Sequence, residues 1–176
     1  MKSWENDFRY DWVSVTLHSL NSGFEVIRNK EDQQPWFDGI WQMEYAENIF
    51  GLAFVAAQAY ILGSVEDVNK IRESAGKERI EKNKYYSDDP QSLPNGISRI
   101  SLINSAANYY KHHDEWDKWP TNGTTKILKD AGILETTEFP LYEVATRLLH
   151  KGEYENMENL LAIISEWREH ILSKYI

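Results

Sequence analysis

The sequence predicts a single all-α domain over residues 1–176, built from about six or seven helices around one long apolar helix. From Phe50 to Leu62 every residue except Gln58 is apolar or glycine, and a helix that is hydrophobic all round is normally the buried centre of a bundle. Elsewhere apolar residues recur every three or four positions, and strand-like alternation is confined to short ambiguous pieces such as 12–17. Because neither an internal repeat nor a linker divides the 176 residues, one core is expected.

The N-terminal part is expected to supply two or three helices. Apolar residues at helical spacing over about 7–30 predict one helix broken near Gly23, or two short helices. The central helix is expected over about 37–62. Its small residues make it slim enough for close packing; they are Gly51, Ala53, Ala56, Ala57 and Ala59.

Ser64 is expected to begin the next helix, with Asp67 as the acidic partner of a capping box. Gly76 is expected to cap the end of that helix. The charged run 76–89 then predicts a fraying helix end followed by a surface loop.

The C-terminal part is expected to add a fourth helix over about 97–113, short helices over about 124–131 and 141–150, and a last helix over about 154–175. Gly132 and Gly152 are expected to close the two short helices. The fourth helix has an apolar stripe at Ile100, Ile103, Ala107 and Tyr110. The last helix places on one face Met157, Leu160, Leu161, Ile164, Trp167 and Ile171.

Composition narrows the functional classes. The chain has no cysteine, which excludes disulfides, thiolate metal sites and a cysteine nucleophile. A net charge of −9 argues against a broad DNA-binding surface, although a small basic pocket remains possible. The N-terminus has no apolar run, and no stretch reaches the roughly 18 apolar residues of a membrane span, so a cytoplasmic protein without a membrane partner is expected. Seven Trp and ten Tyr suggest a surplus for an interface, and the first helix, which carries Tyr10 and Trp12, is expected to form a homodimer surface.

The groups best suited to chemistry lie on the fourth helix. Asn104, Asn108 and His112 are four residues apart and so share one face, beside Lys111. A histidine is a general acid or base near neutral pH, and the two amides would position a phosphate while Lys111 offsets its charge. This combination suits metal-free cleavage of an RNA phosphodiester. The same residues are also typical of an ordinary solvated helix face.

An aromatic loop follows the histidine. Trp116 and Trp119 flank two charged residues in this loop. They predict either a lid that packs on the end of the bundle or a wall on which a base or a partner's side chain stacks.

The segment Asn108-Tyr109-Tyr110-Lys111-His112, together with the apolar helix at 51–61, resembles the HEPN superfamily. The resemblance implies an all-α bundle, often dimeric, of prokaryotic toxin, abortive-infection or defence systems, and in many members a metal-independent endoribonuclease. The family motif is Arg, then four to six residues, then His, often with a polar residue after the Arg. Carried over, His112 takes the histidine position and Asn108 the polar position. The arginine position falls on Ala107, and the nearest upstream arginine, Arg99, lies thirteen residues before His112. The resemblance therefore also fits a non-catalytic relative that keeps the fold for dimerisation or ligand binding.

Four further interpretations follow from the sequence. No metal or other cofactor is expected. In the run 112–115, only His112 and Glu115 share a helix face, and two ligands do not make a metal site. Glu166 and His170 are expected to form a surface pair, and Gln58 to be a polar anchor of the core. The alternative to an RNA-directed protein is a non-enzymatic interaction module, an immunity or regulatory protein that binds a protein partner through an acidic, aromatic surface.

Overall fold

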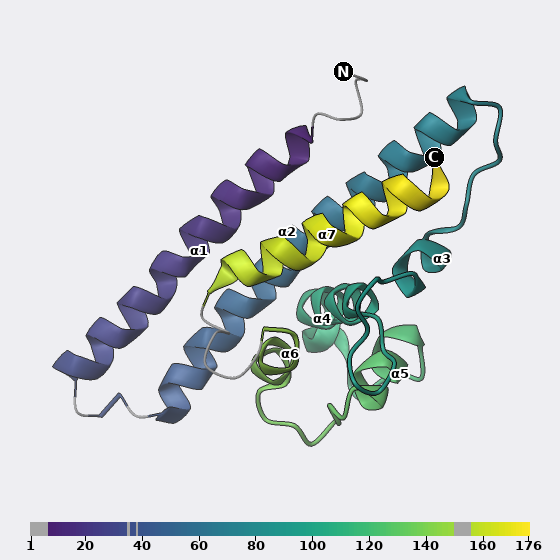
Figure 1. Ribbon diagram of the computed structural model, residues 1–176. Helices are drawn as coiled ribbons and strands as arrows, with labels where there is room; N and C mark the ends of the chain where they lie inside the picture. Colours follow the sequence, from purple (N-terminus) through teal and green to yellow (C-terminus); the bar gives the residue numbers. More distant parts are fainter. Residues whose placement is uncertain (1–6, 35, 38, 150–155) are drawn as a thin grey trace.

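The computed structural model describes residues 7–34, 36–37, 39–149 and 156–176, and within them the protein is all-α (Figure 1). A single β-bridge between Ser92 and Ser98 is the sole extended pairing among the described residues. The helices are α1 (Phe8–Gln33), α2 (Gly39–Ser74), α3 (Lys82–Ser87), α4 (Arg99–His112), α5 (Gly123–Asp130), α6 (Pro140–Leu148) and α7 (Met157–Tyr175). A short 3-10 turn, His113–Glu115, extends α4. The predicted fold class, a helical bundle with a long apolar central helix, is confirmed.

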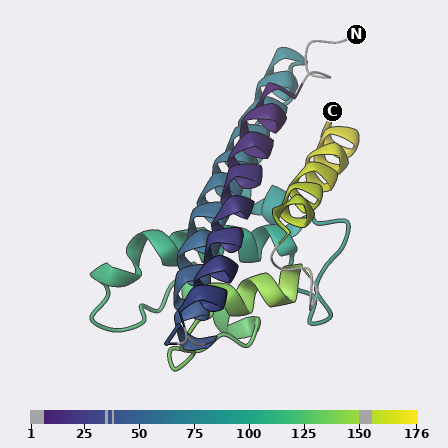
Figure 2. The same ribbon diagram turned by 90° about the vertical axis from the view of Figure 1, so that its left-hand side faces the viewer.

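Helices α1, α2 and α7 run alongside one another, and α4 and α6 pack across α2 in both views (Figures 1 and 2). Helix α5 packs on α4. Helix α2 is therefore central, because α1, α7, α4 and α6 all contact it.

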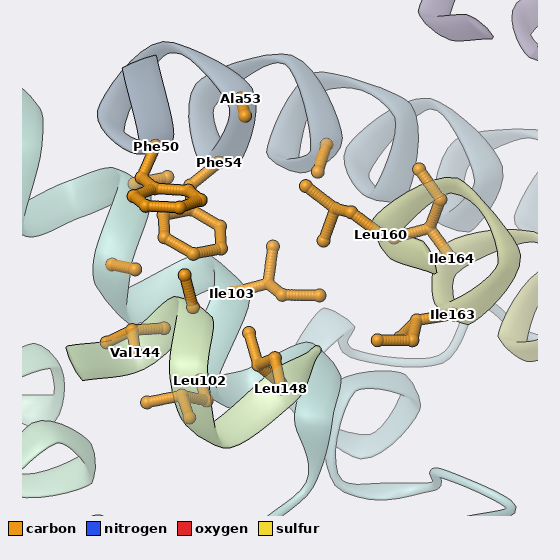
Figure 3. Packing of buried hydrophobic residues seen from close by; sticks show 14 of the residues in the cluster. Phe50, Ala53, Phe54, Leu102, Ile103, Val144, Leu148, Leu160, Ile163 and Ile164 are labelled. Atoms are coloured by element: carbon orange, nitrogen blue, oxygen red, sulfur yellow. The ribbon is translucent and has the colours of Figure 1, made fainter. Parts of the chain in front are cut away.

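The core is built where α2, α4, α6 and α7 meet (Figure 3). Phe50 and Phe54 of α2 are fully buried there, and Ile103 of α4 and Ile164 of α7 lie in the same cluster. Burying a side chain of this size stabilises a protein by about 1.5–3 kcal/mol. The predicted apolar face of α7, from Met157 to Ile171, is buried throughout.

Helix α1 does not break at Gly23. The glycine instead permits a close approach to α2, because a Cβ built there would lie 2.8 Å from Cδ1 of Ile49. Asp7 caps the N-terminus of the helix, because its side chain accepts hydrogen bonds from the backbone N–H groups of Arg9 and Tyr10. The same carboxylate accepts a hydrogen bond from the Tyr60 hydroxyl and so ties the start of α1 to α2.

The expected helix start at Ser64 is wrong, because α2 continues unbroken to Ser74. The Ser64 hydroxyl donates to the carbonyl of Tyr60 at 3.0 Å, a bond within the helix. Asp67, expected in a capping box, instead accepts from Arg9 Nε of α1 at 3.0 Å. Gly76 follows the helix end in the left-handed region, with φ of 73°, as expected of a capping glycine.

The run expected to be a surface loop contains helix α3. Its residues Tyr85 and Tyr86 are buried, and the carbonyl of Tyr85 accepts from Trp167 Nε1 at 3.1 Å. Gly132 has φ of 78° after α5, in agreement with its predicted capping role, whereas Gly152 lies outside the described residues.

Helix α2 is long and apolar enough to cross a membrane by length and composition. However, 61% of its most apolar stretch of 18 residues is buried against the rest of the protein.

Candidate functional site

Helix α4 is oriented by its cap and its apolar stripe. The Ser98 hydroxyl accepts from the backbone N–H of Ser101 at 3.2 Å and caps the helix. Ile100, Ile103 and Ala107 are fully buried, which fixes the rotation of α4 about its axis. Asn104 and Asn108 consequently lie at the edge of the core, half-buried and facing Gln58 of α2.

Four polar side chains form a network between α2 and α4. Lys111 Nζ donates to Gln58 Oε1 at 2.8 Å. Gln58 Nε2 donates to Asn104 Oδ1 at 2.8 Å and to Asn108 Oδ1 at 2.9 Å. Gln58 is 6% exposed, so the network satisfies an amide that would be costly to bury alone. The interpretation of Gln58 as a polar anchor is confirmed.

The network has a defined polarity. A lysine ammonium can only donate, so Gln58 must turn its Oε1 towards Lys111 and its NH₂ group towards the two asparagines. Both asparagines must then present Oδ1 to Gln58. Their Nδ2 groups point away from Gln58 as hydrogen-bond donors, and that of Asn108 lies 3.5 Å from Thr124 Oγ1 of α5.

Asn104 and Asn108 also line a polar cleft between α3, α4 and α5. Its volume is about 550 Å³, within the range of roughly 300–1,000 Å³ usual for small-molecule sites. From α3 and α4 the lining residues are Lys82, Asn83, Tyr86, Ser101, Asn104, Ser105 and Asn108. From α5 and the residue before it they are Asn122, Gly123, Thr124, Lys126 and Ile127.

The charge of the cleft differs from that of the whole chain. The chain carries a net charge of −9, yet the described residues that line the cleft include two lysines and neither Asp nor Glu. Lys126 is largely exposed, and its Nζ forms an ion pair with Asp130 Oδ2 at 2.5 Å. The N-terminus of α5 reaches the cleft at Gly123 and Thr124 and contributes the partial positive charge of a helix dipole. The cleft is therefore suited to an anion.

Tyr86 adds a buried hydroxyl to this region. The residue is 4% exposed, and its phenol oxygen has no hydrogen-bond partner within the described part of the chain. Burial raises the pKa of Tyr86 to about 12, so the hydroxyl keeps its proton at neutral pH and remains a donor.

His112 lies at the end of α4 and is not among the residues that line the cleft. Its side chain is 50% exposed, and its Nδ1 lies 3.3 Å from Glu115 Oε2. A carboxylate in this position can hold the Nδ1 proton and leave Nε2 as the basic nitrogen. The structure thus unites Asn104, Asn108 and Lys111 in one network and places His112 outside it.

The two tryptophans close the end of α4 as an aromatic cluster. The ring centroid of Tyr109 lies 5.8 Å from that of Trp116 and 5.8 Å from that of Trp119. The His113 ring stacks on Tyr109 at 4.8 Å. Both tryptophans are half-buried, so each packs on the bundle and keeps part of its surface in solvent.

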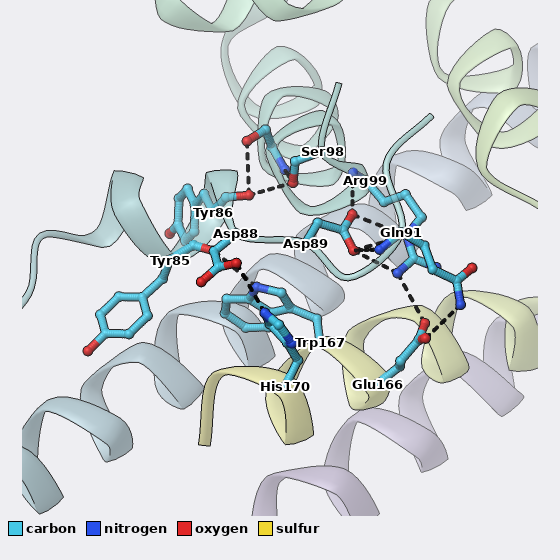
Figure 4. Close-up of polar contacts among 11 residues, drawn as sticks. Tyr85, Tyr86, Asp88, Asp89, Gln91, Ser98, Arg99, Glu166, Trp167 and His170 are labelled. Atoms are coloured by element: carbon cyan, nitrogen blue, oxygen red, sulfur yellow. Dashed lines mark hydrogen bonds and ion pairs between the residues drawn. The ribbon is translucent and has the colours of Figure 1, made fainter. Parts of the chain in front are cut away.

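Neither Ala107, at the arginine position of the motif, nor Arg99, the nearest upstream arginine, brings a guanidinium to the end of α4. Ala107 is fully buried in the core. Arg99, at the other end of the helix, is 8% exposed and binds Asp89 Oδ1 at 2.7 Å and Glu166 Oε2 at 3.0 Å (Figure 4). Its guanidinium is committed to this ion-pair cluster.

Figure 4 also shows that the expected pairing of Glu166 with His170 is wrong. Glu166 accepts from Arg99 and from Gln91 Nε2, the latter at 2.7 Å. His170 Nε2 lies 3.0 Å from Asp88 Oδ1. Both side chains thus fasten α7 to the segment after α3. Among the described residues no group of three or more His, Asp or Glu side chains is arranged to hold a metal ion.

Sequence reasoning missed Lys82, Tyr86 and Lys126 as members of the site. They come from α3, which was expected to be a loop, and from the short helix α5, so their spacing along the chain gives no signal. Comparisons with protein-family models, with curated proteins and with solved structures found no match to this chain.

Proposed function

We propose that this chain is an HEPN-like, RNA-directed protein of a prokaryotic defence or toxin system, related to metal-independent ribonucleases. The observation that supports the proposal is the cleft on α4, whose described lining carries two lysines, several amides and no carboxylate in a chain of net charge −9. Such a lining favours a phosphate ester over a cation or an apolar ligand. In an otherwise acidic protein it gives RNA one defined place to bind.

In the proposed reaction His112 acts at the end of the same helix. Its Nε2 takes the proton of a ribose 2′-hydroxyl, and the 2′-oxygen attacks the adjacent phosphorus. The bond from phosphorus to the 5′-oxygen breaks, and the imidazolium returns a proton to that leaving oxygen. The products are a 2′,3′-cyclic phosphate and a free 5′-hydroxyl. Glu115, 3.3 Å from Nδ1, supports this role because it orients the imidazole.

The remaining site residues have supporting roles in this proposal. Asn104 and Asn108 hold phosphate oxygens, and Lys111 contributes positive charge beside them. Trp116 and Trp119 offer exposed ring surface on which a base stacks, a contact worth about 1–3 kcal/mol per base. The protein is proposed to act in the cytoplasm as a homodimer.

The test is cleavage of single-stranded RNA by the purified protein in EDTA. The proposal predicts cleavage that survives the chelator and is lost in His112→Ala. The matched control is His18→Ala, an exposed histidine on α1 whose loss leaves the rate unchanged. Cleavage that His112→Ala retains, or no cleavage by any of the three proteins, would reject the catalytic role.

A second candidate is a non-enzymatic interaction module, an immunity or regulatory protein. The observation that favours it is the apolar surface of α1, where Phe8 is 78% exposed, Trp12 54% and Val15 68%. Exposed side chains of this size, close together on one helix, are typical of protein interfaces. This candidate predicts that His112→Ala leaves partner binding and the cellular effect unchanged, whereas Trp12→Ser abolishes partner binding.

The proposed homodimer uses the same face of α1. Sedimentation analysis should give a dimer for the unaltered protein and a monomer for a Phe8→Ser, Val15→Ser double variant. The matched control is Leu134→Ser, which removes another large exposed apolar side chain (51%) from the loop after α5 and should leave the dimer intact. A monomer at every concentration for the unaltered protein would refute dimerisation.

A further inference from the structure

We infer that Lys111 makes the cleft selective for phosphate esters by acting through Gln58, so that Lys111 and Gln58 are positioning residues for the ligand rather than groups that touch it. This inference rests on the proposed function, because it names how the proposed RNA-binding cleft holds a backbone phosphate. It assigns a role to Gln58, a buried residue of α2, and a different role to Lys111.

The first step is the orientation of three amides. The two ends of an amide side chain differ in hydrogen-bonding character, and its orientation is set by its neighbours. Lys111 is the one member of the network that can only donate, and its Nζ lies 2.8 Å from Gln58 Oε1. This contact fixes Gln58, and Gln58 in turn fixes Asn104 and Asn108 through bonds of 2.8 and 2.9 Å to their Oδ1 atoms.

The second step concerns the hydrogen-bond donors that the network leaves available to the cleft. With both Oδ1 atoms occupied by Gln58, each asparagine has its Nδ2 donors to offer elsewhere. Lys82 and Lys126 also only donate, and the first turn of α5 adds backbone N–H groups at Gly123 and Thr124. A ligand that meets these groups must bring acceptors and negative charge. A phosphate ester brings both.

The third step concerns Lys111 itself. Its ammonium group is engaged by Gln58, which lies between α2 and α4. Lys111 is not among the residues that line the cleft, whereas Lys82 and Lys126 are. Loss of Lys111 therefore frees Gln58 to turn over, and both asparagines can then present oxygen to the cleft.

Substitution of Gln58 gives the same result from the other side of this contact. The carboxylate introduced by Gln58→Glu would still accept from Lys111 but could no longer donate to the asparagines. Asn104 and Asn108 would then turn their Nδ2 groups towards α2 and their Oδ1 atoms towards the cleft. The same cleft, with its lysines intact, would lose two donors and gain two acceptors.

The experiment is calorimetric titration with two probes. The first is inorganic phosphate, and the second is a short 2′-O-methyl RNA, which has no free 2′-hydroxyl and so reports binding without cleavage. The proteins are the unaltered chain and the variants Lys111→Met, Lys111→Arg, Gln58→Glu and Lys126→Met. The control is Lys129→Met, which removes the same charge from α5 at a residue outside the cleft lining. Thermal unfolding of each variant reports whether the bundle is intact.

The inference predicts that Lys111→Met and Gln58→Glu each weaken RNA binding by at least about tenfold, as expected for lost hydrogen bonds to a charged group. Lys111→Arg restores binding, because arginine also only donates. The loss in Lys111→Met persists at 0.5 M salt relative to Lys129→Met, about where direct charge effects are largely screened. If the unaltered protein binds RNA but has little affinity for free phosphate, the ligand is the backbone diester. If the variants lose affinity for both probes by the same factor, the ligand is the phosphate group alone. Both patterns support the inference.

Three results would overturn it. One is unaltered RNA affinity in Lys111→Met, another is a loss no larger than that of Lys129→Met, and the third is failure of Lys111→Arg to restore binding in a folded protein. These outcomes are separate from those of the cleavage assay. A protein that binds as predicted but does not cleave RNA loses the catalytic proposal alone, and one that cleaves RNA with Lys111→Met binding normally loses this inference alone.

Discussion

Replacing Arg99 with methionine is expected to destabilise the fold strongly, because Arg99 is the counterion of a buried carboxylate. Arg99 Nη2 binds Asp89 Oδ1 at 2.7 Å, and the Asp89 side chain is only 1% exposed. Methionine keeps much of the packing volume and removes the charge. Asp89 would then hold a buried negative charge without its counterion.

The size of this effect follows from what remains around Asp89. Removing one partner of a buried ion pair usually costs about 3–5 kcal/mol. Asp89 would still accept from the backbone N–H groups of Arg99 at 2.7 Å and of Gln91 at 3.1 Å, which places the expected loss near the lower end. Glu166 is 40% exposed on the other side of Arg99 and adds at most about 1 kcal/mol. The expected total is about 3–4 kcal/mol, or a midpoint lower by roughly 6–16 °C for a chain of this size.

The assay is thermal and urea unfolding followed by circular dichroism. The matched control is Arg79→Met, which breaks an exposed ion pair with Glu66 and should leave the midpoint nearly unchanged. Asp89→Asn in the Arg99→Met background should recover part of the loss, since a neutral amide is less costly to bury than a carboxylate. Equal midpoints for Arg99→Met and Arg79→Met would refute the argument that burial of Asp89 makes this pair important.

Three further predictions concern the contacts of α2 and the C-terminal helix. Gly51→Ala should destabilise the fold by about 1–3 kcal/mol in urea unfolding, because the added Cβ would lie 2.1 Å from Cδ2 of Tyr110; an unchanged stability would show that the ring yields freely. Glu47→Ala should cost about 1–2 kcal/mol in the same assay, because Glu47 of α2 accepts from the first backbone N–H groups of α6, those of Leu141 and Tyr142, at 2.8 Å each; a loss below a few tenths would contradict a capping role. Although burial alone would raise the pKa of Asp88, hydrogen bonds from Lys174, Tyr175 and His170 lower it to about 2 from its usual 3.8. Its stabilisation, up to about 2 kcal/mol, is therefore present above pH 3.8 and is lost as the pH falls towards 2, a dependence that Asp88→Asn should remove from acid-unfolding curves.

The sequence predicted those parts of the fold that depend on local pattern. The apolar run around Phe50 and the periodic face of α7 both mark buried helices, and both are buried. Two of the errors concern helix breaks. The break expected near Gly23 and the helix start expected at Ser64 both fall inside helices. Another side chain packs closely on the glycine at each place, Ile49 on Gly23 and Arg9 on Gly63. A glycine can end a helix or allow another side chain to pack closely against it, and only the tertiary structure shows which of the two applies.

The candidate site was predictable only along α4. The spacing of Asn104 and Asn108 correctly placed them on one helix face, but the same rule grouped His112 with them although it lies beyond the cleft. The partner that unites the amides, Gln58, comes from a helix whose pattern indicates only burial. The pairing of residues from α2 and α4 depends on how the two helices cross, and a single sequence does not encode that in its local spacing.

Nuclear magnetic resonance of the side-chain NH₂ groups, followed during titration with the 2′-O-methyl RNA, tests most directly whether the cleft binds phosphate. We expect the NH₂ signals of Asn104 and Asn108 to shift together and saturate, because their Nδ2 groups meet the phosphate. The NH₂ signal of Asn48, which bonds the carbonyl of Glu44 on an exposed part of α2, should stay in place. RNA binding that leaves both Asn104 and Asn108 unshifted would contradict the claim that this cleft is the phosphate-binding site.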